Sequence, residues 1–200
     1  GFAFADTPDT GVSFQTISTG HVSKAEKVLR EISERARKLN QDLKPTDLPV
    51  ADALPQLREP VDGLTVLVEP SDNIGGGAPG DGTGCLRLLV ENGIGNSAVA
   101  INDPAAVAQL AGAEPGSSHT LAIGGRGSSL DEGPLTLVVE FVSRSDGRFE
   151  LEDKQSHLAS LCGDRFEMGD CAVVKHGDIS ILLTSNRTPP FDLGQWRSQG

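Results

Sequence analysis

The chain contains no tyrosine, and its aromatic residues make up only 4% of its 200 residues. Proteins that stack bases or sugars need several exposed aromatic side chains, so this composition disfavours a stacking platform. The chain also lacks a basic cluster: 17 lysines and arginines oppose 28 acidic residues, for a net charge of −11 at pH 7. A surface of this sign repels phosphate groups, so we expect neither nucleic acid nor anionic membrane as a partner.

Long hydrophobic runs are missing as well. The longest, LTVLVE, LTLVVEFV and ISILL, are far shorter than the ~20 residues that span a bilayer. No stretch at the start has the charged and apolar regions of a signal peptide. The three cysteines, Cys85, Cys162 and Cys171, are an odd number without regular spacing. This pattern indicates reduced thiols and a cytoplasmic protein.

Both ends of the chain suggest a piece of a longer polypeptide. It starts at Gly1 without an initiator methionine, and its only methionine is Met168. It stops at WRSQG, directly after a short amphipathic run. Residues 40–63 hold several prolines and little periodicity, which is typical of a domain boundary. We therefore expect residues 1–60 to close one domain and residues 61–200 to form most of another.

The first half of the chain predicts a short strand, VSFQTIS, and then a long helix. Apolar residues recur at helical spacing from Ala25 to Leu39, and Ser23 with Glu26 forms a capping-box pattern at the start. The charges on the other face are mixed, as on a solvated helix face. Without its parent domain, this helix would expose its apolar stripe, so we expect the isolated chain to associate.

The organising stretch of the sequence is a glycine-rich loop between Pro70 and Gly84. An apolar run, LTVLVE, precedes it, and a helical pattern, CLRLLVEN, and a second apolar run, SAVAI, follow it. We predict a strand-loop-helix-strand unit of the βαβ type. Asp103 and Pro104 then begin a short helix, with aspartate as N-cap and proline at the first helical position.

The sequence beyond Gly116 predicts β structure. Five short segments are β-branched or alternating and are separated by glycine turns: HTLAIGG, LTLVVEFVS, RFELED, CAVVKHG and DISILLTS. They predict an antiparallel meander or a small barrel. The chain closes on a proline-rich turn and one helical turn. The expected fold class is therefore mixed α/β.

The glycine loop invites a comparison with phosphate-binding loops. Gly75, Gly77 and Gly80 match the GxGxxG pattern, and Asp103 lies where a ribose-binding acid would sit. However, Asp81 would face the pyrophosphate at the helix N-terminus, and Thr83 replaces the lysine of a Walker-type loop. The simpler interpretation is structural, with Asp81 satisfying the free N–H groups of its own helix.

Metal chemistry has little support in the residue spacing. The histidines are single, and no HxH, HExxH or Cys-x-x-Cys pattern is present. A candidate set consists of His157, Cys162, Asp164 and Cys171, but nothing in its spacing requires these residues to meet.

Nucleophilic hydrolysis also lacks its usual patterns, since there is no GxSxG elbow. Ser185 follows an apolar strand in the segment LLTSNR, and Arg187 comes two residues later. Together they are candidates for binding an anion or a carboxylate. The alternative is a strand-end hydroxyl and an arginine that packs on a neighbouring loop.

Several stretches, taken in order, resemble the microcystinase C (MlrC) family of zinc metallopeptidase-like hydrolases. They are GFAFADTPDTGVS, SDNIGGGAPGDGT, AVAINDPAAV, LAIGGR and ILLTSNRTPPFD. The resemblance covers nearly the whole chain, and NIGGGAPGD followed by LTSNR is its most specific part. One departure is Ile74, which stands where the family loop often has proline.

The resemblance implies a larger enzyme with two domains. Its N-terminal catalytic domain holds zinc through aspartate and histidines, and its C-terminal α/β domain begins near the glycine loop. Residues 1–60 then match the closing strand and helix of the first domain, and residues 61–200 match most of the second. The zinc ligands and the general base are expected upstream of Gly1, so no metal ligand or catalytic residue is assigned within this chain.

The implied function is a fragment of a zinc-dependent amide or peptide hydrolase, inactive alone, whose loop forms one wall of a cleft between domains. Its expected partners are a small peptide or amide substrate, the rest of the parent polypeptide and, in a homo-oligomer, a second copy. The alternative is a non-catalytic α/β binding or scaffold module. Substrate contacts are expected from Asp72, Asn73, Gly75, Gly76, Gly77, Gly80, Asp81, Ser185 and Arg187.

Overall fold

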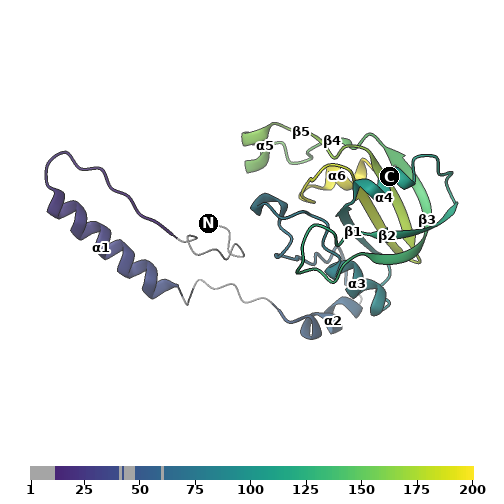
Figure 1. The fold of residues 1–200 in the computed structure, drawn as a ribbon, viewed down its shortest axis with the longest axis horizontal. Coiled ribbons are helices and arrows are strands. Elements are labelled where there is room, and N and C mark those ends of the chain that lie inside the picture. The colour runs from purple at the N-terminus through teal and green to yellow at the C-terminus, as the bar shows by residue number, and fades with distance from the viewer. Residues whose placement is uncertain (1–11, 41, 43–47, 60) are drawn as a thin grey trace. The chain divides into compact units, whose positions relative to one another are not determined.

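The computed structural model describes residues 12–40, 42, 48–59 and 61–200. The chain divides into two compact units, Gly1–Asp62 and Gly63–Gly200. Figure 1 shows the helices and strands of both units. Among the described helices, none is long and apolar enough to cross a membrane.

The described part of the first unit contains two helices. The predicted long helix is present as α1 (Val22–Leu39), and none of its residues is buried. Its N-cap is His21 and no side chain caps the helix, so the predicted capping box of Ser23 and Glu26 does not form. The amphipathic pattern thus predicted the helix correctly, whereas the capping box predicted at its N-terminus was wrong.

One further expectation for the first unit was wrong. Residues 12–18, the VSFQTIS segment, contain no strand. A strand needs a ladder partner, and none pairs with this segment among the described residues. In the stretch interpreted as a boundary, α2 spans Val50–Arg58 and contains Pro55. The segment GFAFADTPDTG lies outside the described residues.

The second unit is built around a five-stranded sheet in the order β1-β7-β6-β3-β2. Strands β2, β3, β6 and β7 pair antiparallel, and β1 pairs parallel with β7. This confirms the mixed α/β class and the meander; the sheet is open, with β1 and β2 at its edges, rather than a closed small barrel. The strands are β1 (Ser97–Asn102), β2 (Ser118–Ile123), β3 (Leu135–Ser145), β6 (Cys171–His176) and β7 (Ile179–Thr184).

The side chains of each strand alternate between the two faces of the sheet, so apolar residues on both faces need to be covered. Ile181 and Leu183 of β7 belong to one buried cluster with residues of α3 and α4, whereas Leu182 belongs to a second cluster on the other face. A separate hairpin of β4 and β5, with residues of α5 and α6, contributes to the second cluster. The bounds are α3 (Gly84–Glu91), α4 (Pro104–Gln109), β4 (Arg148–Glu150), α5 (His157–Cys162), β5 (Arg165–Glu167) and α6 (Leu193–Arg197).

The strand predicted at LTVLVE does not form. Residues 64–69 have no regular secondary structure, and the side chains of Leu64, Val66 and Val68 are 78%, 70% and 76% exposed. The helix and second strand of the expected unit are present as α3 and β1, but the parallel partner of β1 is β7, from near the end of the chain. Periodicity identified these elements correctly, whereas the pairing depends on contacts distant in the sequence.

Candidate functional site

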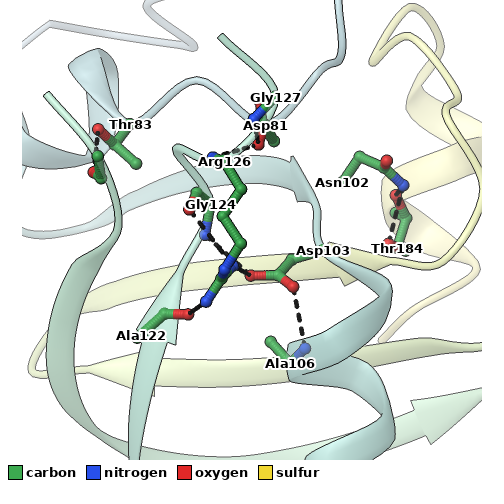
Figure 2. A network of polar contacts seen from close by, with 11 residues as sticks. Asp81, Thr83, Asn102, Asp103, Ala106, Ala122, Gly124, Arg126, Gly127 and Thr184 are labelled. Carbon is green, nitrogen blue, oxygen red and sulfur yellow. Dashed lines mark hydrogen bonds and ion pairs between the residues drawn. The ribbon is translucent and has the colours of Figure 1, made fainter. Parts of the chain in front are cut away.

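The carboxyl ends of β1 and β7 lie side by side because these strands are parallel neighbours. Asn102 and Thr184, their last residues, face each other in the register. The Nδ2 group of Asn102 donates to the carbonyl oxygen of Thr184 at 3.0 Å, and the N–H of Asp103 donates to the same oxygen at 2.9 Å. Figure 2 shows the contact between Asn102 and Thr184. Open α/β sheets commonly bind ligands at such an edge, so we take it as the candidate site.

Asp103 connects this edge to the opposite side of the sheet. Its Oδ1 accepts the N–H of Ala106 at 3.0 Å, as the predicted N-cap of α4. Its Oδ2 accepts the N–H of Gly124, directly after β2, at 2.9 Å, and the Nη1 of Arg126 at 2.8 Å. Figure 2 shows these bonds, and the residue is only 3% exposed. The sheet is therefore coiled so that the ends of its two edge strands meet at one buried charge.

Two residues of the glycine loop fill the gap between these strand ends. The carbonyl oxygen of Gly80 accepts the N–H of Asn102 at 2.8 Å, and that of Asp81 accepts the N–H of Gly125 at 2.7 Å. Gly80 has φ +75°, and a Cβ there would lie 2.3 Å from Cδ1 of Ile74. The backbone conformation therefore favours glycine at this position, and a larger residue would also have to displace the side chain of Ile74.

The side chain of Asp81 holds the loop that follows β2. Its Oδ2 accepts the N–H groups of Arg126 and Gly127, each at 2.7 Å (Figure 2). Its Oδ1 is buried and has no hydrogen-bond partner among the described residues, and the residue is 8% exposed. Asp81 therefore does not satisfy the N–H groups of its own helix, which corrects the structural interpretation made from the sequence.

Asp131 performs that role from 48 residues away. Its Oδ2 accepts the N–H of Thr83, and its Oδ1 accepts the hydroxyl of Thr83, both at 2.8 Å. Burial raises the pKa of Asp131, but hydrogen bonds from Thr83 and the N–H of Gly133, with the nearby charge of Arg87, lower it below 3.8 overall. A carboxylate at the start of α3 occupies the position that a pyrophosphate would take, and Asp103, which is 3% exposed, presents no accessible oxygen to a ribose. This arrangement disfavours the dinucleotide interpretation.

Asp72 fixes the shape of the glycine loop from within. Its two carboxylate oxygens accept the N–H groups of Gly80 at 2.8 Å and Gly82 at 2.6 Å. Burial raises the pKa of Asp72, the two N–H groups lower it, and the charges of Asp81 and Glu69 raise it; the net shift is upward. Asp72 and Asp81 are thus close enough to interact electrostatically inside one loop.

The tip of the loop is a short 3₁₀ helix, η1 (Ile74–Gly76), which ends at Gly77 with φ +98°. The carbonyl oxygen of Asn73 accepts the N–H groups of Gly76 at 2.9 Å and Ala78 at 3.2 Å, and Gly77 donates to Ile74 at 2.9 Å. Asn73 and the three glycines at 75–77 are exposed. Internal bonds therefore occupy several of the loop's N–H groups, which leaves few for an anion.

The two candidates near the C-terminus lie directly after β7. The hydroxyl of Ser185 donates to the carbonyl oxygen of Asp170 at 2.8 Å, so this serine stabilises a loop. Arg187 is exposed, and no hydrogen bond or ion pair joins it to another described residue. Because Asn102 joins Gly80 to Thr184, the glycine loop and the start of the Ser185 segment share one edge of the sheet.

The candidate metal set does not assemble. His157 and Cys162 are exposed on α5, whereas Cys171 is buried in β6. Burial raises the pKa of Cys171 to about 11. Throughout the described part of the chain, no three His, Cys, Asp or Glu side chains are grouped to hold a metal ion. These residues therefore do not fit a zinc centre.

Sequence reasoning missed Asn102, Thr184 and Asp131 as parts of this site. Asn102 is a polar residue at the end of an apolar strand, which is a usable signal for a strand-end site. Asp131 lies in a loop with no local feature that links it to Thr83. Such a long-range cap is visible only once the chain is folded.

Comparison with known proteins identifies relatives of this architecture. The family model described as "MlrC C-terminus" matches residues 67–200, about two thirds of the chain. A solved structure named "Putative metallopeptidase" from Mesorhizobium sp. BNC1 is 22% identical, with a TM-score of 0.76. The match covers 88% of this chain but only 34% of that one, so this chain spans about a third of the neighbour's length. No curated protein matches the chain.

The buried bonds of Asp103 predict a large loss of stability on truncation. Asp103→Ala leaves the N–H groups of Ala106 and Gly124 without acceptors, and we expect a loss of about 3 kcal/mol in the free energy of unfolding. Urea denaturation measures this. Asp170→Ala, at an exposed aspartate, is the control and should change stability by less than about 0.5 kcal/mol. Equal effects of the two substitutions would contradict the assigned role of Asp103.

The lowered pKa of Asp131 predicts a pH-dependent contribution to stability. For a carboxyl whose folded pKa is depressed, the stabilisation is complete above the unfolded value, 3.8, and is lost as the pH falls through the folded pKa. The stability difference between the wild type and Asp131→Asn should therefore be largest near neutral pH and shrink as the pH falls below 3.8. Urea denaturation across this pH range tests it, with Glu132→Gln as the exposed neighbour for comparison. A difference that does not vary with pH would refute the prediction.

Proposed function

Because the chain belongs to the MlrC C-terminus family, we propose that it forms one wall of the active-site cleft in a zinc-dependent peptide or amide hydrolase. The metallopeptidase name of the structural neighbour supports the reaction class. The neighbour is about three times as long as the matched region, so the rest of the cleft belongs to the remainder of the parent polypeptide.

The observation that carries this proposal is the hydrogen-bonded path across the sheet edge. Gly80 is bonded to Asn102, and Asn102 is bonded to Thr184, so the loop is tied to the segment that carries Ser185 and Arg187. The expected contact residues on the loop, Asn73 and the glycines at 75–77, are exposed beyond this path. A rigid edge with an exposed glycine tip allows a substrate to approach the backbone closely.

Arg187 gives the wall a binding function. Most arginines of the second unit have carboxylate or carbonyl partners, as Arg126 has in Asp103, but Arg187 has neither a hydrogen bond nor an ion pair with any described residue. A guanidinium without a partner favours an anionic ligand. We assign it to a carboxylate of the peptide or amide substrate, and Ser185 to the support of its loop.

The zinc ion and the general base are proposed to belong to residues outside this chain. The described residues offer no ligand set, and Asp72, Asp103 and Asp131 each bond through both carboxylate oxygens. Their role is to hold the wall in shape. The three cysteines are free thiols, which supports a cytoplasmic location.

Replacing the guanidinium tests the binding role. In the complete polypeptide, Arg187→Gln should raise KM for carboxylate-bearing substrates by about tenfold or more, because a charge-assisted contact is lost, with kcat changed by less than about threefold. Steady-state kinetics measures both constants. Lys175→Gln, at another exposed cation, is the matched control for the change in net charge. A KM that stays at the wild-type value in Arg187→Gln would remove Arg187 from the site.

Zinc analysis tests where the ligands lie and separates the hydrolase from the alternative of a binding module. The isolated 200-residue chain, dialysed against zinc and then desalted, should retain less than about 0.1 zinc per chain, whereas the complete polypeptide should retain about one. Elemental analysis gives the ratio, and Cys162→Ser controls for binding by the exposed thiol. Stoichiometric zinc on the isolated chain would contradict the proposed ligand location. A complete polypeptide without zinc would favour the binding module.

A further inference from the structure

One edge of the sheet has backbone groups that face away from the ladder. Because Asp103 donates to Thr184 of β7 and Asn102 donates to Gly80, alternate residues of β1 point to opposite sides. By the same alternation, the N–H and C=O groups of Ala98 and Ala100 point outward, away from β7. No backbone bond joins them to any other described residue. Ala98 is exposed and Ala100 packs partly against the second cluster, so the unpaired groups at this edge are those of the backbone.

The same unit contains an apolar segment without a partner. Residues 64–69, LTVLVE, are rich in strand-forming residues, and no backbone hydrogen bond is made by them within the described chain. Leu64, Val66 and Val68 are each at least 70% exposed. An unpaired apolar segment of this length is a typical template for strand pairing.

A turn follows this segment. The carboxylate of Glu69 accepts the N–H groups of Ser71 and Asp72, each at 3.0 Å. Asp72 is held in turn by Gly80 and Gly82. The end of the segment is thus fixed to the loop while its apolar side chains face solvent, and no backbone bond of the segment has to break for it to pair elsewhere.

We propose that residues 64–69 of one copy add as a strand to the outer edge of β1 in a second copy. A twofold arrangement satisfies both copies, since each provides one segment and one edge. The apolar segment and the unpaired backbone groups of Ala98 and Ala100 on the outer edge of β1 are then explained by a single contact. The repulsion between chains of charge −11 opposes the dimer, so the dimer strengthens as salt screens it.

Sedimentation equilibrium over a wide range of protein concentration tests the proposal with two variants. Val66→Lys alters the segment, and Ala100→Pro removes one outward N–H while keeping the ladder to β7. Each should raise the dimer dissociation constant by about tenfold or more. Val138→Lys, at a valine of β3 that is 61% exposed, is the matched control and should leave dimerisation unchanged. Both lysine variants reduce the net negative charge by the same amount. If Val66→Lys weakens the dimer and Val138→Lys does not, the change in net charge cannot be the cause.

A mixture of the two variants provides a second measurement. Val66→Lys retains an intact edge and Ala100→Pro retains an intact segment, so the mixture should form heterodimers that neither variant forms alone. Protection of the Val99 amide from hydrogen exchange confirms that Ala100→Pro is folded. The proposal is overturned if the chain stays monomeric at all concentrations, if protection of the Ala98 and Ala100 amides does not depend on concentration, or if Ile32→Lys on α1 abolishes the dimer while Val66→Lys does not.

Discussion

The arrangement of the second unit depends on one buried carboxylate, Asp103. It follows β1, caps α4, and accepts hydrogen bonds from Gly124 and Arg126 beyond β2. The strands at the two edges of an open sheet would otherwise end far apart, since three strands lie between them. A buried charge is tolerated only when donors surround it, so the donors have to be brought to Asp103. The coiling of the sheet and the position of the loop after β2 follow from that requirement.

The glycine loop is part of the same closure. Gly80 and Asp81 bond to the residues after β1 and β2 respectively, and the carboxylate of Asp72 fixes the loop from the inside. The positive φ of Gly80 and the closeness of Ile74 explain why a side chain is excluded there. A loop whose sequence resembles a phosphate-binding loop therefore has a different role, which is to connect the ends of β1 and β2. Its N–H groups at Gly80 and Gly82 bond to the protein's own carboxylate rather than to an anion.

Local patterns predicted the elements, and long-range contacts decided the rest. The periodicity of α1, the N-cap at Asp103 and the alternating segments of the meander are all local signals, and each corresponds to an observed element. The segment 64–69 was assigned as a strand by the same logic, but a strand also needs a partner, and β1 pairs with β7 instead. The cap from Asp131 to Thr83 depends on residues 48 positions apart, so no sequence window contains it. Of the candidate site, the loop and the Ser185 segment were visible in the sequence, whereas the Asn102 link between them was not.

The distribution of hydrogen bonds also bears on the hydrolase function that we propose. A general acid or base must exchange a proton with substrate or water, which requires an accessible oxygen or nitrogen. Asp72, Asp103 and Asp131 use both oxygens to hold backbone and side chains, and the remaining oxygen of Asp81 is buried. The exposed groups at the edge are instead the glycine tip and the Arg187 side chain. Such an edge is suited to binding and orienting a substrate, and in the proposed hydrolase proton transfer would therefore fall to residues outside this chain.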